Sequence, residues 1–179
     1  MTGRELPLAE RAVELRRQFD RSFAAAPSGE AVESEDLLAI RVGADSYAVR
    51  LAEVSGLFAG RRIVSLPTER PDFLGLTGLR GALLPVFDLG RLLGGSQAGA
   101  PRWLMTAAAA PVALGFDGFD GHLRLPRGAL VPQEIAAPAR RHVREVVRTG
   151  DRVRPVVHLA SVLEAIYRRA PAGAPDEER

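Results

Sequence analysis

The sequence predicts a mainly β protein with two similar β-barrel halves, an N-terminal amphipathic helix and a C-terminal helix. Three observations support this fold class. Segments in which apolar and polar side chains alternate recur along the 179 residues, and glycine and proline turns separate them. One pattern of a strand followed by a short helix occurs twice. Aromatic residues make up only 6% of the chain, so we expect mainly aliphatic cores.

The first regular segment is an amphipathic helix over residues 6–23, which we assign to an N-terminal unit of residues 1–24. Its apolar side chains recur at intervals of three and four residues, and charged residues occupy the other faces. These apolar residues are Leu8, Ala12, Leu15, Phe19 and Phe23. Residues 25–36 are small, polar and acidic, which predicts a linker.

From residue 37 the apolar period changes from that of a helix to that of a strand. Alternation on both sides of Gly43–Ser46 predicts a β-hairpin over 37–51, and residues 54–58 continue as a strand. The apolar run Leu83–Phe87 predicts a strand buried on both faces, after which Asp88 caps a short helix.

The second half of the chain repeats this kind of pattern. We expect strands at 103–108, 112–116 and 119–125, a hairpin over 142–157, and a helix from 159 to about 169. Asp117 and Asp120, among glycines, are predicted to be turn or bulge residues. The composition of residues 171–179 predicts a disordered tail.

The duplicated pattern joins these two halves. Leu84–Leu93 (LPVFDLGRLL) is similar to Arg154–Leu163 (RPVVHLASVL): each is a strand with a proline, then a polar residue, then a short apolar helix. A glycine turn lies a few residues before both copies. The duplication predicts that residues 37–170 form one domain of two similar β-barrel subdomains.

The sequence gives little support to catalysis. There is no cysteine, which excludes disulfides and thiolate ligands, and the three histidines lack the spacing of a metal site. The glycines within Gly75–Gly81 do not match a phosphate-binding loop, and a hairpin turn explains them better. We therefore expect no enzyme, no cofactor and no metal.

The charge pattern is only weak evidence for nucleic-acid binding. The formal net charge is +2, and the pI of about 9.9 follows from the fact that the chain has arginine but no lysine or cysteine. Six arginines fall within Arg140–Arg154, but Glu145 and Asp151 dilute them and no aromatic lies among them to stack a base. A nucleic-acid-binding β-barrel that uses the Arg140–Arg154 face is the alternative function.

Targeting signals are also missing from the sequence. The first residues are too charged for the core of a signal peptide, and the longest uncharged apolar run is interrupted by Pro111. We therefore expect a cytoplasmic protein.

Four blocks of this sequence resemble the CheW family of bacterial chemotaxis adaptors. They are LLAIRVGADSYAVRLAEVSGLF (37–58), IVSLPTERPDFLGLTGLRGALLPVFDLGRLLG (63–94), PVALGFDGFDGHLRLP (111–126) and REVVRTGDRVRPVVHLASVLEAI (144–166). The resemblance implies two packed five-stranded SH3-like β-barrels and no catalysis. It also implies an adaptor that couples the cytoplasmic tip of a methyl-accepting chemoreceptor to the regulatory domain of a CheA-type histidine kinase. Such an adaptor is recruited to membrane-anchored receptor arrays, without inserting into the membrane and without nucleic acid.

The same resemblance implies a partner-binding site in a glycine-rich turn and in the strand that borders the receptor groove. Its residues are Val54, Gly56, Gly75, Gly78, Leu79, Arg80 and Gly81. Arg80 matches the arginine of the family's N-L-R-G turn, which is tied to receptor and kinase coupling. A guanidinium there could fix the register of a receptor helix by hydrogen bonds. The other interpretation is a salt bridge of Arg80 within its own barrel.

Three positions depart from the family's pattern. Gly78 stands where Asn is usual, Gly56 where an acidic residue is common, and Ala113 where Gly is usual. The loss of two polar contacts at the expected groove predicts a divergent adaptor with one altered interface. The N-terminal helix is an addition to the core fold. It could pack on its own barrel, between copies of the chain in self-association, against a partner, or in the receptor groove.

Overall fold

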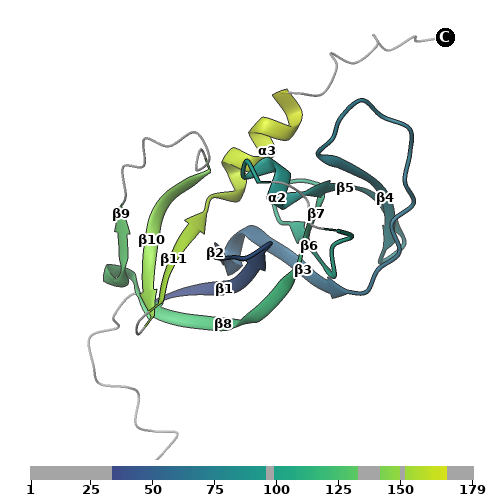
Figure 1. Ribbon diagram of the computed structural model, residues 1–179. Helices are drawn as coiled ribbons and strands as arrows, with labels where there is room; N and C mark the ends of the chain where they lie inside the picture. Colours follow the sequence, from purple (N-terminus) through teal and green to yellow (C-terminus); the bar gives the residue numbers. More distant parts are fainter. Residues whose placement is uncertain (1–33, 96–98, 133–141, 150–151, 169–179) are drawn as a thin grey trace, which may run out of the picture. The chain divides into compact units, whose positions relative to one another are not determined.

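The computed structural model describes residues 34–95, 99–132, 142–149 and 152–168, which form two β-sheets and two α-helices (Figure 1). Sheet 1 consists of β1 (Ser34–Val42), β2 (Asp45–Arg50), β8 (Gly118–Pro126), β9 (Leu130–Pro132), β10 (Val143–Thr149) and β11 (Arg152–Val157), in the spatial order β8–β1–β2–β11–β10–β9. Sheet 2 consists of β3 (Val54–Ala59), β4 (Phe73–Leu79), β5 (Ala82–Asp88), β6 (Trp103–Ala107) and β7 (Ala113–Phe116), in the order β3–β6–β7–β5–β4. The helices are α2 (Leu89–Leu92) and α3 (Leu159–Arg168), with short 3₁₀ turns η1 (Leu51–Glu53) and η2 (Arg127–Ala129).

The predicted fold class is confirmed as mainly β, with two β-barrel subdomains and a C-terminal helix. Sheet 1 has a sixth strand, because the short β9 adds to the edge of β10 through three residue pairs. β1 begins at Ser34, within the expected linker, since Ser34 pairs with Pro126 of β8. The expected helix in residues 1–24 and the expected tail at 171–179 lie outside the described residues.

The sequence repeat explains how the two sheets are connected. The first copy runs from β1 to α2 and the second from β6 to α3, and each copy places its first two strands in one sheet and its later strands in the other. In sheet 2, β5 pairs antiparallel with β4 and parallel with β7. In sheet 1, β11 pairs antiparallel with β10 and parallel with β2. The two halves of the sequence therefore exchange strands and do not form one barrel each.

The main hydrophobic core lies where the two sheets meet the helices. It joins Ile40 of sheet 1 with Leu114 of sheet 2 and Val162 of α3, all of which are fully buried. Smaller clusters fill each sheet separately, around Val147 in sheet 1 and Leu104 in sheet 2. Because buried aliphatic surface stabilises the folded state, this shared core fixes sheet 1 against sheet 2.

The expectation that Leu83–Phe87 is buried on both faces is wrong at one end. Val86 and Phe87 are buried, whereas the Leu83 side chain is 69% exposed. β5 has a second neighbouring strand only at Val86–Asp88, where it pairs with β7, so its first residues have β4 alone beside them. No helix among the described residues is long and apolar enough to cross a membrane.

Candidate partner-binding surface

The turn between β4 and β5 is the centre of the candidate surface. Arg80 and Gly81 connect the paired residues Leu79 and Ala82, with φ angles of 50° and 80°. A two-residue hairpin loop with positive φ at both positions is a type I′ turn, which favours Asn and Gly. Arg80 is the only non-glycine residue with positive φ in the described ranges, and this backbone conformation costs about 1 kcal/mol or more. An arginine held in such a position suggests a function for its side chain.

The exposed Arg80 side chain lies over an aromatic ring of a different strand. Its guanidinium carbon is 5.5 Å from the centroid of Phe58 in β3, and that of Arg61 is 5.7 Å from the same centroid. Contacts of this kind contribute about 0.5–1 kcal/mol each at exposed sites. Arg80 forms no ion pair with a described residue, so its interaction within its own barrel is with Phe58 and is not the salt bridge considered from the sequence.

Gly56 makes room for the Phe58 ring. A Cβ atom at Gly56 would lie 2.8 Å from Cε2 of Phe58, closer than real Cβ atoms approach, and 3.0 Å from Oγ1 of Thr106, which is tighter than most real contacts. Phe58 also packs on the core cluster of sheet 2 that contains Leu79. The structure therefore brings Gly56, Leu79 and Arg80 together around one ring.

Three predicted site residues lie outside this cluster. Val54, at the start of β3, packs against the main core. Gly75 has a φ of 131°, and a Cβ there would lie 2.1 Å from the carbonyl oxygen of Val64, so its role is to let Val64 pair with Leu76. Gly78 lies within β4 with no atom within 4 Å of a built Cβ. Of the expected turn glycines, Gly81 alone is in the turn, since Gly75 and Gly78 are strand residues.

Sequence reasoning missed two members of the cluster, Phe58 and Arg61. The sequence predicts a strand that ends at Phe58, and an aromatic residue at the end of a strand followed by Arg61 and Arg62 is a local sign of a cation–π contact. The sequence alone did not indicate that Arg80, which is 22 residues after Phe58 in the chain, lies over the same ring.

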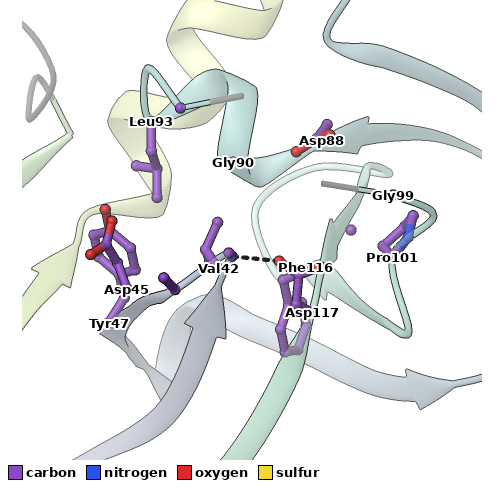
Figure 2. A pocket seen from close by; sticks show the side chains of 14 residues that line it. Val42, Asp45, Tyr47, Asp88, Gly90, Leu93, Gly99, Pro101, Phe116 and Asp117 are labelled. Atoms are coloured by element: carbon purple, nitrogen blue, oxygen red, sulfur yellow. Dashed lines mark hydrogen bonds between the residues drawn. The ribbon is translucent and has the colours of Figure 1, made fainter. Parts of the chain in front are cut away.

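A hollow of about 330 Å³ lies between the sheets, and its lining includes the carboxylates Asp45, Asp88 and Asp117 (Figure 2). Asp117 accepts a hydrogen bond from the Gly43 N–H (2.6 Å), and Asp88 accepts one from the Arg91 N–H (3.1 Å), which confirms Asp88 as the predicted helix cap. Burial raises the pKa of Asp88 above 3.8, while hydrogen bonds from Arg91 and Gly90 oppose that rise. No group of His, Cys, Asp or Glu within the described ranges is suited to a metal ion.

The Arg140–Arg154 segment does not form one basic face in the part of the chain that the structure describes. Arg148 lies opposite Val153, whereas Arg154 lies opposite Val147, so the two arginines project to opposite sides of the hairpin. Arg154 is 5% exposed and its Nη2 lies 3.9 Å from Oδ2 of Asp120, which is the bulge residue of β8 as predicted. Residues 140 and 141 lie outside the described ranges.

Comparisons with known proteins concern the family and the fold of the domain. A family model for the CheW-like domain matches residues 36–167. None of the curated proteins matches the chain. The crystal structure of the scaffolding protein TtCheW from Thermoanaerobacter tengcongensis is similar, with a TM-score of 0.63, 15% sequence identity, and coverage of 70% of this chain and 89% of that chain. At this identity the structural likeness concerns the fold.

Proposed function

The chain belongs to the CheW-like domain family, and on this premise we propose that it is a non-catalytic scaffold in a bacterial chemosensory pathway. In this role it couples the signalling tip of a chemoreceptor to the regulatory domain of a CheA-type histidine kinase. The observation that carries the proposal is the family match over residues 36–167, which includes nearly all of both sheets and the Arg80 turn.

The local geometry supports binding by surface contact. A receptor helix would place apolar side chains along the strand that contains Val54 and Gly56, and a guanidinium from Arg80 would donate hydrogen bonds to it. A type I′ turn is rigid, so Arg80 is held ready at the end of the β4–β5 hairpin before a partner arrives.

The remaining parts of the proposal follow from these partners. Chemoreceptor tips and CheA-type kinases lie on the cytoplasmic side of the membrane, so the scaffold is placed in the cytoplasm and is recruited to receptor arrays. Residues 37–170 form its two-barrel domain, and residues 1–24 are a segment added to that domain. The glycines at positions 56 and 78 make it a divergent adaptor with one altered interface.

Two binding measurements test this function. The purified full chain is titrated with a receptor signalling-tip fragment and, separately, with a CheA-type regulatory domain, both from the genome that encodes the chain. We expect saturable binding to at least one of them, weakened about tenfold or more by Arg80→Asp because an interfacial charge is reversed. Arg148→Asp, on the other sheet, is the matched control. Binding of neither partner by the wild-type chain would overturn the proposal.

A further inference from the structure

We propose that Arg61 and Arg80, held over the ring of Phe58, form a docking surface for an acidic segment of a protein partner. This inference rests on the proposed function for the identity of the partner and adds the chemistry that the partner must present. It also assigns a binding role to Arg61, which follows β3 and lies 19 residues before Arg80 in the chain.

The first support is the convergence of two positive charges on one ring. The guanidinium carbons of Arg61 and Arg80 lie 5.7 and 5.5 Å from the Phe58 centroid, although the two arginines come from different connections of sheet 2. The ring lies over Gly56, where a Cβ atom would come within 2.8 Å of Cε2 of Phe58, so the missing side chain leaves room for it. Both positive charges are therefore held at one ring, where a carboxylate brought by a partner can pair with them.

The second support is the charge balance of sheet 2. Residues 54–116 contain six arginines and three acidic residues: Arg61, Arg62, Arg70, Arg80, Arg91 and Arg102, with Glu69, Asp72 and Asp88. The two buried carboxylates are already used, since Asp72 pairs with Arg70 at 2.7 Å and Asp88 lies 3.9 Å from Arg91.

The four remaining arginines are all exposed, and none forms an ion pair with a described residue; they are Arg61, Arg62, Arg80 and Arg102. The Gly60 N–H donates a hydrogen bond to the Arg102 carbonyl (3.0 Å), which places Arg102 beside the connection that contains Arg61. The Thr77 hydroxyl donates one to the Arg62 carbonyl (2.8 Å), which places Arg62 beside β4. Sheet 2 thus presents uncompensated positive charge, which attracts an acidic partner and speeds its association.

The third support is the apolar surface beside these charges, which favours a protein partner over a nucleic acid. Leu83 is 69% exposed three residues after Arg80, and it lies opposite Gly78, which has no side chain to cover it. Val64 is 53% exposed three residues after Arg61. Nucleic acids need phosphate contacts and aromatic rings free for stacking, whereas the Phe58 ring carries two guanidinium groups. Acidic and aliphatic side chains in one protein segment match both features of this surface.

A peptide titration tests the inference without depending on the receptor or kinase. The probe is a synthetic helical peptide with Glu and Leu side chains, and its counterpart has Gln in place of Glu. We expect the full chain to bind the Glu peptide with an affinity that falls as salt is raised, and to bind the Gln peptide at least tenfold more weakly. Arg61→Glu and Arg80→Glu should each weaken binding of the Glu peptide about tenfold, and Arg148→Glu should leave it within twofold.

Three outcomes would overturn the inference. These are equal affinity for the Glu and Gln peptides, an Arg148→Glu loss as large as that of Arg61→Glu, and tighter binding of a single-stranded oligonucleotide than of the Glu peptide. Circular dichroism on each variant checks that the fold is retained.

The receptor and kinase titrations separate failure of the inference from failure of the proposed function. If the wild-type chain binds neither protein but binds the Glu peptide through Arg61 and Arg80, the proposed function fails and the acidic-partner surface stands. If a receptor tip or kinase domain binds and Arg61→Glu has no effect on that complex or on the peptide, the proposed function stands and the surface fails.

Discussion

A Cβ atom on Gly56 would lie 2.8 Å from Cε2 of Phe58, so β3 can hold that ring in place only because residue 56 has no side chain. Gly56 stands where the CheW resemblance leads us to expect an acidic residue. In this chain a carboxylate at position 56 would displace the platform on which Arg61 and Arg80 lie. Glycine at 56 and the cation–π cluster are therefore linked features.

We predict that Gly56→Ala lowers the free energy of unfolding by about 1–3 kcal/mol, because the added methyl group overpacks Phe58 and Thr106. Gly78→Ala is the control, since a Cβ there has no atom within 4 Å and its φ is not positive. Urea unfolding of both variants measures the difference. Equal stability of the two variants would show that Phe58 moves aside without loss.

Arg80 provides a test that separates stability from binding. Arg80→Gly removes the conformational cost of a non-glycine residue at positive φ, which stabilises the fold. It also removes the cation–π contact with Phe58 and raises the conformational entropy of the unfolded chain, and both of these effects destabilise the fold. Since these effects oppose each other, we expect the free energy of unfolding to stay within about 1 kcal/mol of wild type. Partner binding, measured by calorimetry on the same sample, should fall about tenfold or more. A loss of more than about 2 kcal/mol in the free energy of unfolding would show that Arg80 serves mainly to stabilise the fold.

Asp88 predicts a specific pH dependence. Burial raises its pKa above 3.8, so the folded chain binds this proton more tightly than the unfolded chain. The stabilising contribution of protonated Asp88 is fully present below about pH 3.8 and is lost as pH rises through the folded pKa. Asp88→Asn keeps a capping oxygen without the titration. The unfolding free energy of wild type minus that of Asp88→Asn should therefore decrease as pH is raised.

Urea unfolding of the two proteins from about pH 3 to about pH 7 measures this difference. An increase with pH would mean that the hydrogen bonds from Arg91 and Gly90 outweigh burial. Asp88→Ala separates the cap from the charge, since we expect it to be about 1 kcal/mol less stable than Asp88→Asn throughout that range.

Local patterns were enough to predict most elements of this fold. The β1–β2 hairpin, the cap at Asp88 and the helix after Val157 all follow from residues close in sequence. The duplicated motif also holds in the structure, where Pro85 lies opposite Leu76 and Pro155 opposite Val146 in matching hairpins. Alternation and capping depend on local geometry, so a single sequence contains them.

Features that depend on strands distant in the sequence could not be predicted from local patterns. The exposure of Leu83 follows from where β7 stops along β5, and the exchange of strands between the repeats follows from pairing across the chain. The Phe58 cluster needs β3 and the β4–β5 turn to be adjacent, so sequence patterns indicated Arg80 but neither Phe58 nor Arg61. The face of Arg154 depends on hairpin register, which placed it inside the protein and apart from Arg148.

The buried Arg154 side chain is only partly paired. The Arg154 Nε has no hydrogen-bond partner among the described residues, and its Nη2 is 3.9 Å from Asp120, which has a shorter contact of 2.9 Å with Arg41. Burying an arginine with incomplete pairing is unfavourable, and an apolar side chain of similar length removes that penalty. We therefore expect Arg154→Met to leave the free energy of unfolding unchanged or to raise it by about 1 kcal/mol, measured in urea. A loss of about 3 kcal/mol or more in the free energy of unfolding would show that the Arg154–Asp120 pair stabilises the fold. In that case the contact with Arg41 alone would not compensate the charge of Asp120.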